Sequence, residues 1–128
     1  MSQSWTRVCA LEEIVPDTGV CALIGMRQVA VFRLGADQVF AIGNHDPFSR
    51  ANVLARGIVG DRSGRPKVAS PIFKQNFDLQ TGVCMDDPSV SVPAYQTRVC
   101  DGIVEVGEVL TSTLRPGNTG SLSEVQSA

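Results

Sequence analysis

The sequence predicts one all-β domain, a sandwich or barrel built from short antiparallel strands. Val, Ile, Thr and Phe recur in short runs, and Gly, Pro, Asn and Asp stand between the runs, which is typical of strands joined by tight turns. The Asp-Gly pair at positions 101–102 separates TRVC from IVEV and predicts a hairpin, because both turn residues tolerate a positive φ. Helix signals are weak, and 128 residues are enough for one domain with its own core.

Strands are expected along most of the chain. They cover residues 6–10, 21–24, 28–34, 39–42, 58–61, 67–70, 77–78, 96–100 and 103–106. Turns at residues 16–19, 25–27, 35–37, 63–66 and 101–102 separate them. A short helical piece is expected near residues 11–14 or 49–54. From residue 111 onward the composition becomes small and polar, so residues 1–110 are assigned to the domain and residues 111–128 to a flexible tail.

Charge and hydropathy argue against two classes of partner. The net charge is −2, from 11 Lys and Arg against 13 Asp and Glu, so there is no basic excess to bind nucleic-acid phosphates. The first residues, MSQSWTRV, lack the apolar core of a signal peptide, and the longest apolar and glycine run, 19–26, is too short to cross a bilayer. The sequence therefore predicts a cytoplasmic protein with no nucleic-acid or membrane partner.

The four cysteines, at positions 9, 21, 84 and 100, are interpreted as small buried hydrophobic residues. They form no C-x-x-C pair, and the single histidine of the chain, His45, is not near any of them in sequence. A disulfide or a metal site is the less favoured alternative.

No catalytic residue is predicted. His45 stands beside Asp46, but adjacent side chains in an extended loop point apart, which favours a capping or partner-contact role over a general-base dyad. Ser70 has no G-x-S-x-G elbow around it. Asp86 and Asp87 lie in a turn and are interpreted as solvated loop charge rather than as paired acid and base.

Residues 39–82 resemble the cluster-binding half of Rieske domains, where two loops at one tip of a small β-sandwich hold a [2Fe–2S] cluster. The matching residues are Ala41, Ile42, Asn44, Pro47 and Ala51 for the first loop, and Pro71, Phe77, Asp78, Leu79, Thr81 and Gly82 for the second. The resemblance places the four ligand positions at Asp46, Phe48, Ser70 and Phe73. Rieske domains use two thiolates and two imidazoles there, whereas this chain has one histidine in total and no cysteine between residues 22 and 83. The resemblance therefore implies a tip that has lost the cluster ligands, with no metal held by this chain.

The replacement residues are expected to hold the two loops together in place of a cluster. Phe48 and Phe73 are expected to pack against each other. Asp46 and Ser70 are expected to hydrogen-bond backbone N–H groups in the tip. The alternative is that all four are ordinary loop residues with no joint role.

One Rieske-like family that lacks these ligands is the small subunit of assimilatory NAD(P)H-dependent nitrite reductase, and residues 4–108 resemble it. The matching segments read NHDPFS, ARGIVGD and ASPIFKQNFDLQTG. The resemblance implies a partner, the large subunit, that carries FAD, an iron–sulfur cluster and sirohaem and reduces nitrite to ammonium with electrons from NADH or NADPH. It also implies that this chain belongs to an oxidoreductase complex without binding a cofactor or contributing catalytic residues.

The tip loops are also the expected docking surface for the large subunit, because arginine and aromatic residues together are favoured at protein–protein contacts. The candidate contact residues are Arg50, Arg56, Ile72, Lys74 and Gln75, which lie around Phe48 and Phe73. The alternative is that the cationic side chains only keep the loops soluble and contact no partner.

Two other functions stay open. The chain is alternatively an adaptor or regulatory module of another redox complex, built on the same cluster-free fold. A ferredoxin-like electron carrier is the third function considered, and the missing ligands argue against it.

Overall fold

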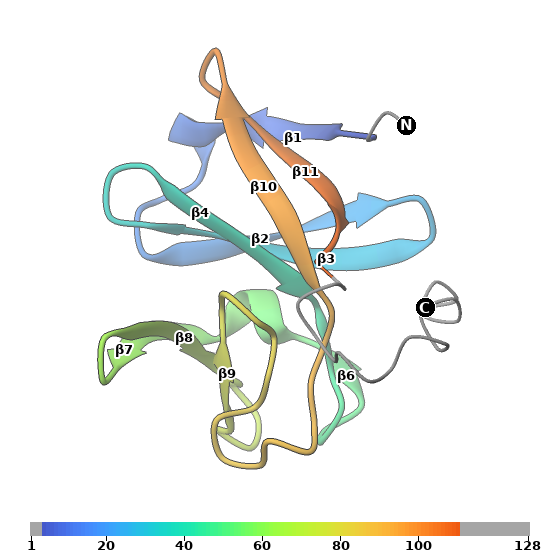
Figure 1. The fold of residues 1–128 in the computed structure, drawn as a ribbon, viewed down its shortest axis with the longest axis vertical. Coiled ribbons are helices and arrows are strands. Elements are labelled where there is room, and N and C mark those ends of the chain that lie inside the picture. Colours follow the sequence, from blue (N-terminus) through green and yellow to red (C-terminus); the bar gives the residue numbers. More distant parts are fainter. Residues whose placement is uncertain (1–3, 111–128) are drawn as a thin grey trace.

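The computed structural model describes residues 4–110 and shows an all-β molecule in two parts (Figure 1). The larger part is a six-stranded antiparallel sheet that curls toward a barrel. The smaller part packs beneath it in the view and holds a three-stranded sheet and a two-stranded hairpin. The predicted all-β class is confirmed. In the described part of the chain, no helix is long and apolar enough to cross a membrane.

The large sheet has the strand order β1-β11-β10-β4-β3-β2. Its strands are β1 (Thr6–Ala10), β2 (Thr18–Ile24), β3 (Arg27–Leu34), β4 (Gln38–Gly43), β10 (Ala94–Cys100) and β11 (Ile103–Val109). Tight turns join β2 to β3 and β10 to β11, and the second of these is the hairpin predicted from Asp101 and Gly102, both of which have a positive φ. Because β1 and β2 each pair on one side within this order, they are the two edges of the sheet.

The smaller part is inserted between β4 and β10. It contains the hairpin of β5 (His45–Asp46) and β6 (Ala51–Asn52), followed by the sheet of β7 (Ile58–Arg62), β8 (Arg65–Ala69) and β9 (Asn76–Asp78). The loop between β5 and β6 and the loop between β8 and β9 carry the four positions that resemble cluster ligands. These two loops are called the tip loops below.

The predicted strands are all present, with boundaries that differ by a few residues. The sequence missed β5 and β6, because strands of two residues carry no periodic pattern. The helical piece expected near residues 11–14 is a 3₁₀ turn at Leu11–Glu13, and a second 3₁₀ turn follows the other expected region, at Leu54–Arg56. The predicted tail, residues 111–128, lies outside the described residues.

Two apolar clusters fill the molecule, and β3 contributes to both. Alternate side chains of a strand face opposite sides of a sheet. Val29 and Val31 therefore enter the cluster enclosed by the curled sheet, while Phe32 enters the cluster between the sheet and the smaller part, where it meets Leu54 and Phe77. The smaller part is thus held on the sheet by a shared core.

Asn44 adds a polar connection between the two parts, directly after β4. Its side chain is buried, its Oδ1 accepts a hydrogen bond from the backbone N–H of Ala55 at 2.7 Å, and its Nδ2 donates to Gln28 Oε1 at 3.0 Å. Its backbone carbonyl accepts a bond from the N–H of Leu54 at 3.1 Å. A buried amide with all these partners fixes the direction in which the chain enters the first tip loop.

Candidate functional site at the tip loops

The two tip loops are joined by a buried hydrogen-bond network centred on Asp46. Asp46 ends β5, and its side chain is fully buried. Its Oδ1 accepts a bond from the backbone N–H of Phe48 at 2.9 Å. Its Oδ2 accepts bonds from the hydroxyl of Ser49 at 3.0 Å and from the hydroxyl of Ser70 at 2.6 Å. Because Ser70 belongs to the other loop, one carboxylate holds both loops.

Ser70 is the hydrogen-bonding partner of Asp46 in the second loop and is also fully buried. Its hydroxyl, besides donating to Asp46, accepts a bond from the N–H of Ile72 at 3.3 Å. Its backbone N–H donates to the carbonyl of Gln75 at 2.9 Å, and its carbonyl accepts from the N–H of Lys74 at 3.1 Å. The structure shows the backbone hydrogen bonds expected of Asp46 and Ser70, and it adds a direct bond between them that the sequence did not predict.

The hydrogen bonds keep the Asp46 carboxyl ionised. Burial by itself would raise its pKa, because a charge is poorly solvated away from water. The bonds from Ser70, Phe48 and Ser49 outweigh the effect of burial and leave the pKa below the ordinary value of 3.8. At neutral pH the tie between the loops is therefore made of charge-assisted hydrogen bonds, which are shorter and stronger than neutral ones.

Acid should weaken this tie. Because folding lowers the pKa of Asp46, its contribution to the free energy of unfolding is complete above the unfolded-state value of about 4 and is lost as pH falls through the folded value. We expect urea midpoints of the unmodified chain to fall below about pH 4. The Asp46→Asn variant, which has no proton to gain there, should show a shallower fall, and superimposable pH profiles of the two proteins would contradict the assignment.

The two phenylalanines do not pair as expected. The ring of Phe48 is half-buried and packs on Phe77, with the ring centroids 6.1 Å apart and the planes tilted by 53°. Phe73 is 57% exposed. The expectation that Phe48 and Phe73 pack against each other is therefore wrong. Phe77 comes from β9 and is buried in the shared core, and Phe48 packs against that core rather than against the exposed ring of Phe73.

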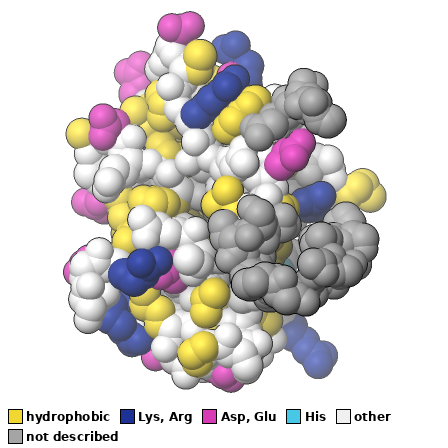
Figure 2. All heavy atoms as spheres, viewed as in Figure 1, with side chains coloured by type: hydrophobic (Ala, Val, Ile, Leu, Met, Phe, Trp, Pro, Cys, Tyr) yellow, Lys and Arg dark blue, Asp and Glu magenta, His cyan; other side chains and the backbone are white. Residues whose placement is uncertain are grey.

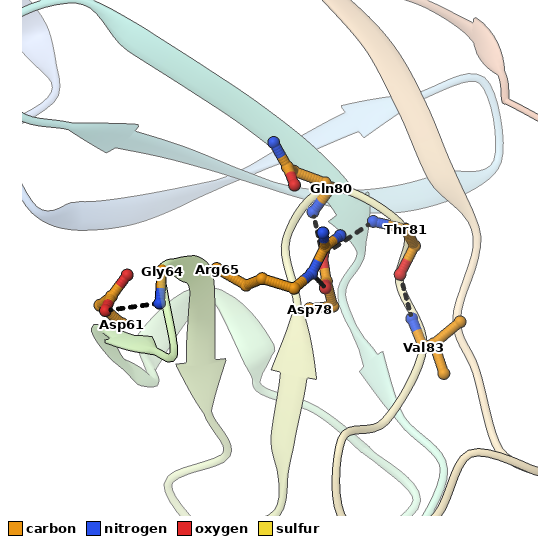
Figure 3. A network of polar contacts seen from close by, with 7 residues as sticks. All are labelled: Asp61, Gly64, Arg65, Asp78, Gln80, Thr81 and Val83. Carbon is orange, nitrogen blue, oxygen red and sulfur yellow. Dashed lines mark hydrogen bonds and ion pairs between the residues drawn. The ribbon is translucent and has the colours of Figure 1, made fainter.

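A second polar network fixes the turn after β9 (Figure 3). Asp78 is buried, and its Oδ2 forms an ion pair with the guanidinium of Arg65 at the start of β8. Its Oδ1 accepts bonds from the N–H groups of Gln80 at 2.7 Å and Thr81 at 3.1 Å. The hydrogen bond and the charge of Asp78 raise the pKa of Arg65. The sequence assigned no role to Asp78, although an aspartate before a turn commonly binds the N–H two residues on.

Asp86 is more than the solvated loop charge that the sequence suggested. Its Oδ2 accepts bonds from the backbone N–H of Asn76 at 2.7 Å and from Asn76 Nδ2 at 3.1 Å, and its Oδ1 pairs with Arg62 at 3.2 Å. The backbone bond from Asn76, followed by the contacts with Arg62, lowers the pKa of Asp86. Asp87 is exposed, and within residues 4–110 its carboxylate accepts bonds from Ser89, the N–H at 3.2 Å and the hydroxyl at 2.6 Å. The interpretation as loop charge therefore fits Asp87 and is corrected for Asp86.

His45 and Asp46 lie on opposite sides of β5. His45 is exposed, and its Nδ1 is 3.0 Å from Oδ1 of Asn52 on β6, whereas Asp46 is buried. The contact of His45 is a cross-strand one, and the geometry forms no acid–base dyad with Asp46.

The four cysteines are free thiols at different depths. Cys84 is buried, Cys9 is half-buried, and Cys21 and Cys100 are exposed. Burial and the nearby Glu13 carboxylate raise the pKa of Cys9. The interpretation as buried hydrophobic residues is right for Cys84 and wrong for Cys21 and Cys100, whose strands turn them toward solvent.

The candidate contact residues all lie in the smaller part of the molecule. Arg50, Arg56, Ile72 and Lys74 are exposed, whereas Gln75 is half-buried and its side-chain oxygen has no hydrogen-bond partner within residues 4–110. Arg50 and Lys74 have φ angles of 63° and 64°, so each tip loop presents a cation at a tight bend. Ion pairs in the described part involve Arg62, Arg65 and Arg98 and none of these cations. Figure 2 shows Lys and Arg side chains in separate groups on the face in view, with apolar side chains between them.

The fold and this tip define a Rieske-like domain, and residues 4–107 match the family described as "Rieske-like [2Fe-2S] domain". The NADH nitrite reductase small subunit of Escherichia coli strain K12 is 50% identical over 107 residues, which cover 83% of this chain and 98% of that relative. The NMR structure of the E. coli protein NirD has a TM-score of 0.77 at 48% identity and matches 83% of this chain and 97% of its own. The chain therefore belongs to the nitrite reductase small-subunit family.

A further relative is a large subunit. The NAD(P)H nitrite reductase large subunit of Klebsiella oxytoca is 43% identical to this chain over 106 residues, which cover 83% of this chain but 11% of that protein. A counterpart of this domain is thus part of a much longer polypeptide in that relative.

The tip does not fit the cluster that the family description names. A Rieske cluster takes two thiolates and two imidazoles. Asp46 and Ser70 are bonded to each other, Phe48 packs on Phe77, and Phe73 has no nitrogen or sulfur to offer. Within residues 4–110, no group of three or more His, Cys, Asp or Glu is placed to hold a metal ion. We therefore assign no chemistry to a cluster at this tip.

Proposed function

We propose that the chain is the non-catalytic small subunit of an assimilatory NAD(P)H nitrite reductase and that it supports the reduction of nitrite to ammonium by the large subunit. One observation carries the proposal. In a member of this family, the loops that hold the redox centre of Rieske proteins are joined by the buried bond between Ser70 and Asp46. A domain with such a tip contributes contacts and shape to a complex rather than electrons.

The redox chemistry is assigned in this proposal to the large subunit. FAD, an iron–sulfur cluster and sirohaem on that partner pass electrons from NADH or NADPH to nitrite. The K. oxytoca relative supports a close association, because its large subunit carries a counterpart of this domain in the same polypeptide. Two parts that are fused in one relative are expected to work in contact when they are separate.

The tip loops are proposed to contact the large subunit. Ile72 and Phe73 are 44% and 57% exposed, Lys74 follows them in the same loop, and Arg50 lies in the other tip loop; neither cation has an acidic partner in the described chain. Exposed apolar groups together with arginine and lysine are well suited to a protein partner with apolar and acidic groups. Arg56 and Gln75 complete the proposed contact residues.

Coexpression tests the proposal. The chain is produced with a sirohaem-containing large subunit, and copurification and NADH-dependent loss of nitrite are measured. We expect the two proteins to copurify and nitrite to be consumed faster than by the large subunit alone. The chain purified by itself should contain no stoichiometric iron or acid-labile sulfide. A large subunit that neither retains the chain nor gains activity from it would overturn the proposal and favour an adaptor of another complex.

Neutralising the tip should weaken the complex. We expect the double variant Arg50→Gln/Lys74→Gln to bind the large subunit about tenfold more weakly, mainly because two charges of the contact are lost. The control Gln38→Glu/Ser63→Glu changes the net charge equally but at exposed positions outside the tip loops, the first residue of β4 and the turn between β7 and β8. Equal affinities of the two variants, measured by titration calorimetry, would exclude the tip as the contact surface.

We also propose that the chain works in the cytoplasm. Cys9, Cys21, Cys84 and Cys100 are all free thiols, and such thiols are typical of proteins from reducing compartments.

A further inference from the structure

The six-stranded sheet is open between β1 and β2. These strands are its two edges, and no pairing joins them within residues 4–110. A groove of about 400 Å³ lies between them and is lined by consecutive residues of each strand, 6–9 and 20–24, and by Glu13. Consecutive residues point alternately inward and outward. A groove lined by both kinds therefore runs along the strand edges, where backbone groups are offered, rather than over one face.

The ladder of β2 with β3 shows which backbone groups face this groove. The two-residue turn after Ile24, with Gly25 at φ +64°, makes the Ile24–Arg27 pair a hydrogen-bonded one. The next pair, Leu23 with Gln28, is then not hydrogen-bonded, and the carbonyl of Gln28 accepts a bond from Asn44 instead. The N–H and C=O groups of Leu23, and by alternation those of Cys21, therefore point away from β3 into the groove.

β2 lacks the usual protection of an edge strand. Exposed edges normally carry charged residues, proline or a bulge, which discourage the addition of another strand. The sequence of β2, TGVCALI, has no charged residue and no proline, and its pairing with β3 is unbroken over seven residues. The opposite edge, β1, has a bulge between Arg7 and Cys9. Leu23, whose backbone faces the groove, is 72% exposed.

The groove continues from β2 toward the tip loops. At Thr6 and Ile24 it meets a second groove at the mouth of the curled sheet. That groove shares Met26, Arg27 and Tyr95 with a third, which reaches His45 and Asn52 on the β5–β6 hairpin. The loop of this hairpin carries Arg50, one of the proposed contact residues. Three neighbouring grooves with shared lining residues thus lie between the proposed contact surface and the edge of β2.

We propose that β2 is a docking edge that takes an extended, mainly uncharged segment of the nitrite reductase large subunit as an added strand, an inference that rests on the proposed function. Because β1 bounds the groove on its other side, we expect a single strand to enter it more easily than the sheet edge of a second copy, which would have to displace β1. Main-chain hydrogen bonds provide the affinity in such strand addition, and shallow pockets beside the strand provide the selectivity.

Hydrogen exchange of single amides tests the inference. The ¹⁵N-labelled full-length chain is measured alone and with excess unlabelled large subunit. We expect the amides of Cys21 and Leu23 to exchange rapidly in the chain alone and at least about 100-fold more slowly in the complex. The amides of Val20 and Ala22, which pair with β3, should be protected in both states and provide the internal control.

Two variants at one position separate a backbone contact from a side-chain contact. Leu23→Pro removes an N–H that β3 does not use, and proline is tolerated at an edge with that orientation. Leu23→Thr removes the apolar side chain and keeps the N–H. We expect Leu23→Pro to weaken binding of the large subunit at least about tenfold and Leu23→Thr by less than about threefold.

Each outcome of the exchange experiment either supports or overturns the inference that β2 takes an added strand. Slow exchange of Cys21 and Leu23 only in the complex supports strand addition. Protection that appears when the chain alone is concentrated assigns the edge to a second copy, and protection that disappears when residues 111–128 are removed assigns it to the chain's own C-terminal segment. Both results overturn the inference. A complex that forms while these amides still exchange rapidly overturns the inference and leaves the proposed function intact, whereas the absence of any complex removes both.

Discussion

The Asp46→Ala variant is expected to lose about 3 kcal/mol of the free energy of unfolding. The substitution deletes the acceptor of three hydrogen bonds, and it leaves the buried hydroxyl of Ser70 and the part-buried N–H of Phe48 without that partner. Removing one side of a buried, charge-assisted network costs more than the bonds themselves contribute, because the remaining donors stay desolvated. Urea unfolding at neutral pH, followed by circular dichroism, measures the loss.

Asp87→Ala is the matched control. It removes the same side chain from the same part of the molecule, but the Asp87 carboxylate is exposed and, among the described residues, accepts bonds from Ser89. We expect this variant to lose less than about 1 kcal/mol. If the two variants unfold at the same urea concentration, Asp46 is not the tie between the tip loops.

Gly82→Ala is expected to be at least as damaging, with a loss of more than about 3 kcal/mol. Gly82 has a φ of +81°, and a Cβ placed on it would lie 2.1 Å from the carbonyl oxygen of Val92. The backbone cannot retreat easily, because the N–H of Gly82 donates to the carbonyl of Asp78 and its own carbonyl accepts from Val92. Differential scanning calorimetry should show a clearly lowered melting temperature or no cooperative transition.

Gly35→Ala separates the cost of a positive φ from the cost of the close approach to Val92. Gly35 has a similar φ of +62°, but nothing lies within 4 Å of a Cβ built there. Its substitution should cost only the conformational penalty, about 1 kcal/mol. A Gly82→Ala protein as stable as Gly35→Ala would mean that the close approach to Val92 relaxes without cost.

The sequence predicted the strands of the large sheet because each is bounded by strong turn residues and carries a periodic apolar pattern. The hairpin at Asp101 and Gly102 is an example in which two residues fix the local geometry. It did not predict β5 or β6, which are two-residue pairings created by the packing of the tip loops rather than by strand propensity. The strand order of the open sheet also depends on long-range pairing, such as that of β1 with β11, which no local signal announces.

The site was predicted in part. The resemblance located the two tip loops and the positions of Asp46 and Ser70, since the flanking motifs are specific. It did not predict that these two side chains bind each other, and it gave Phe48 the wrong partner. Whether the side chains of Asp46 and Ser70 come within hydrogen-bonding distance depends on tertiary packing, because the two residues are far apart in the sequence. For the same reason the sequence missed the ion pair of Arg65 with Asp78, whose members lie on neighbouring strands.

The carboxylate-to-hydroxyl bond between the loops has a consequence for how the protein matures. A joint made only of side chains is complete as soon as the polypeptide reaches its native fold, with no delivery of iron or sulfide and no assembly proteins. When the hydrogen bond between Asp46 and Ser70 opens transiently, no bound group is lost, so the same bond can form again. Exposure to air or to chelators, which strips many metalloproteins irreversibly, should leave this joint untouched.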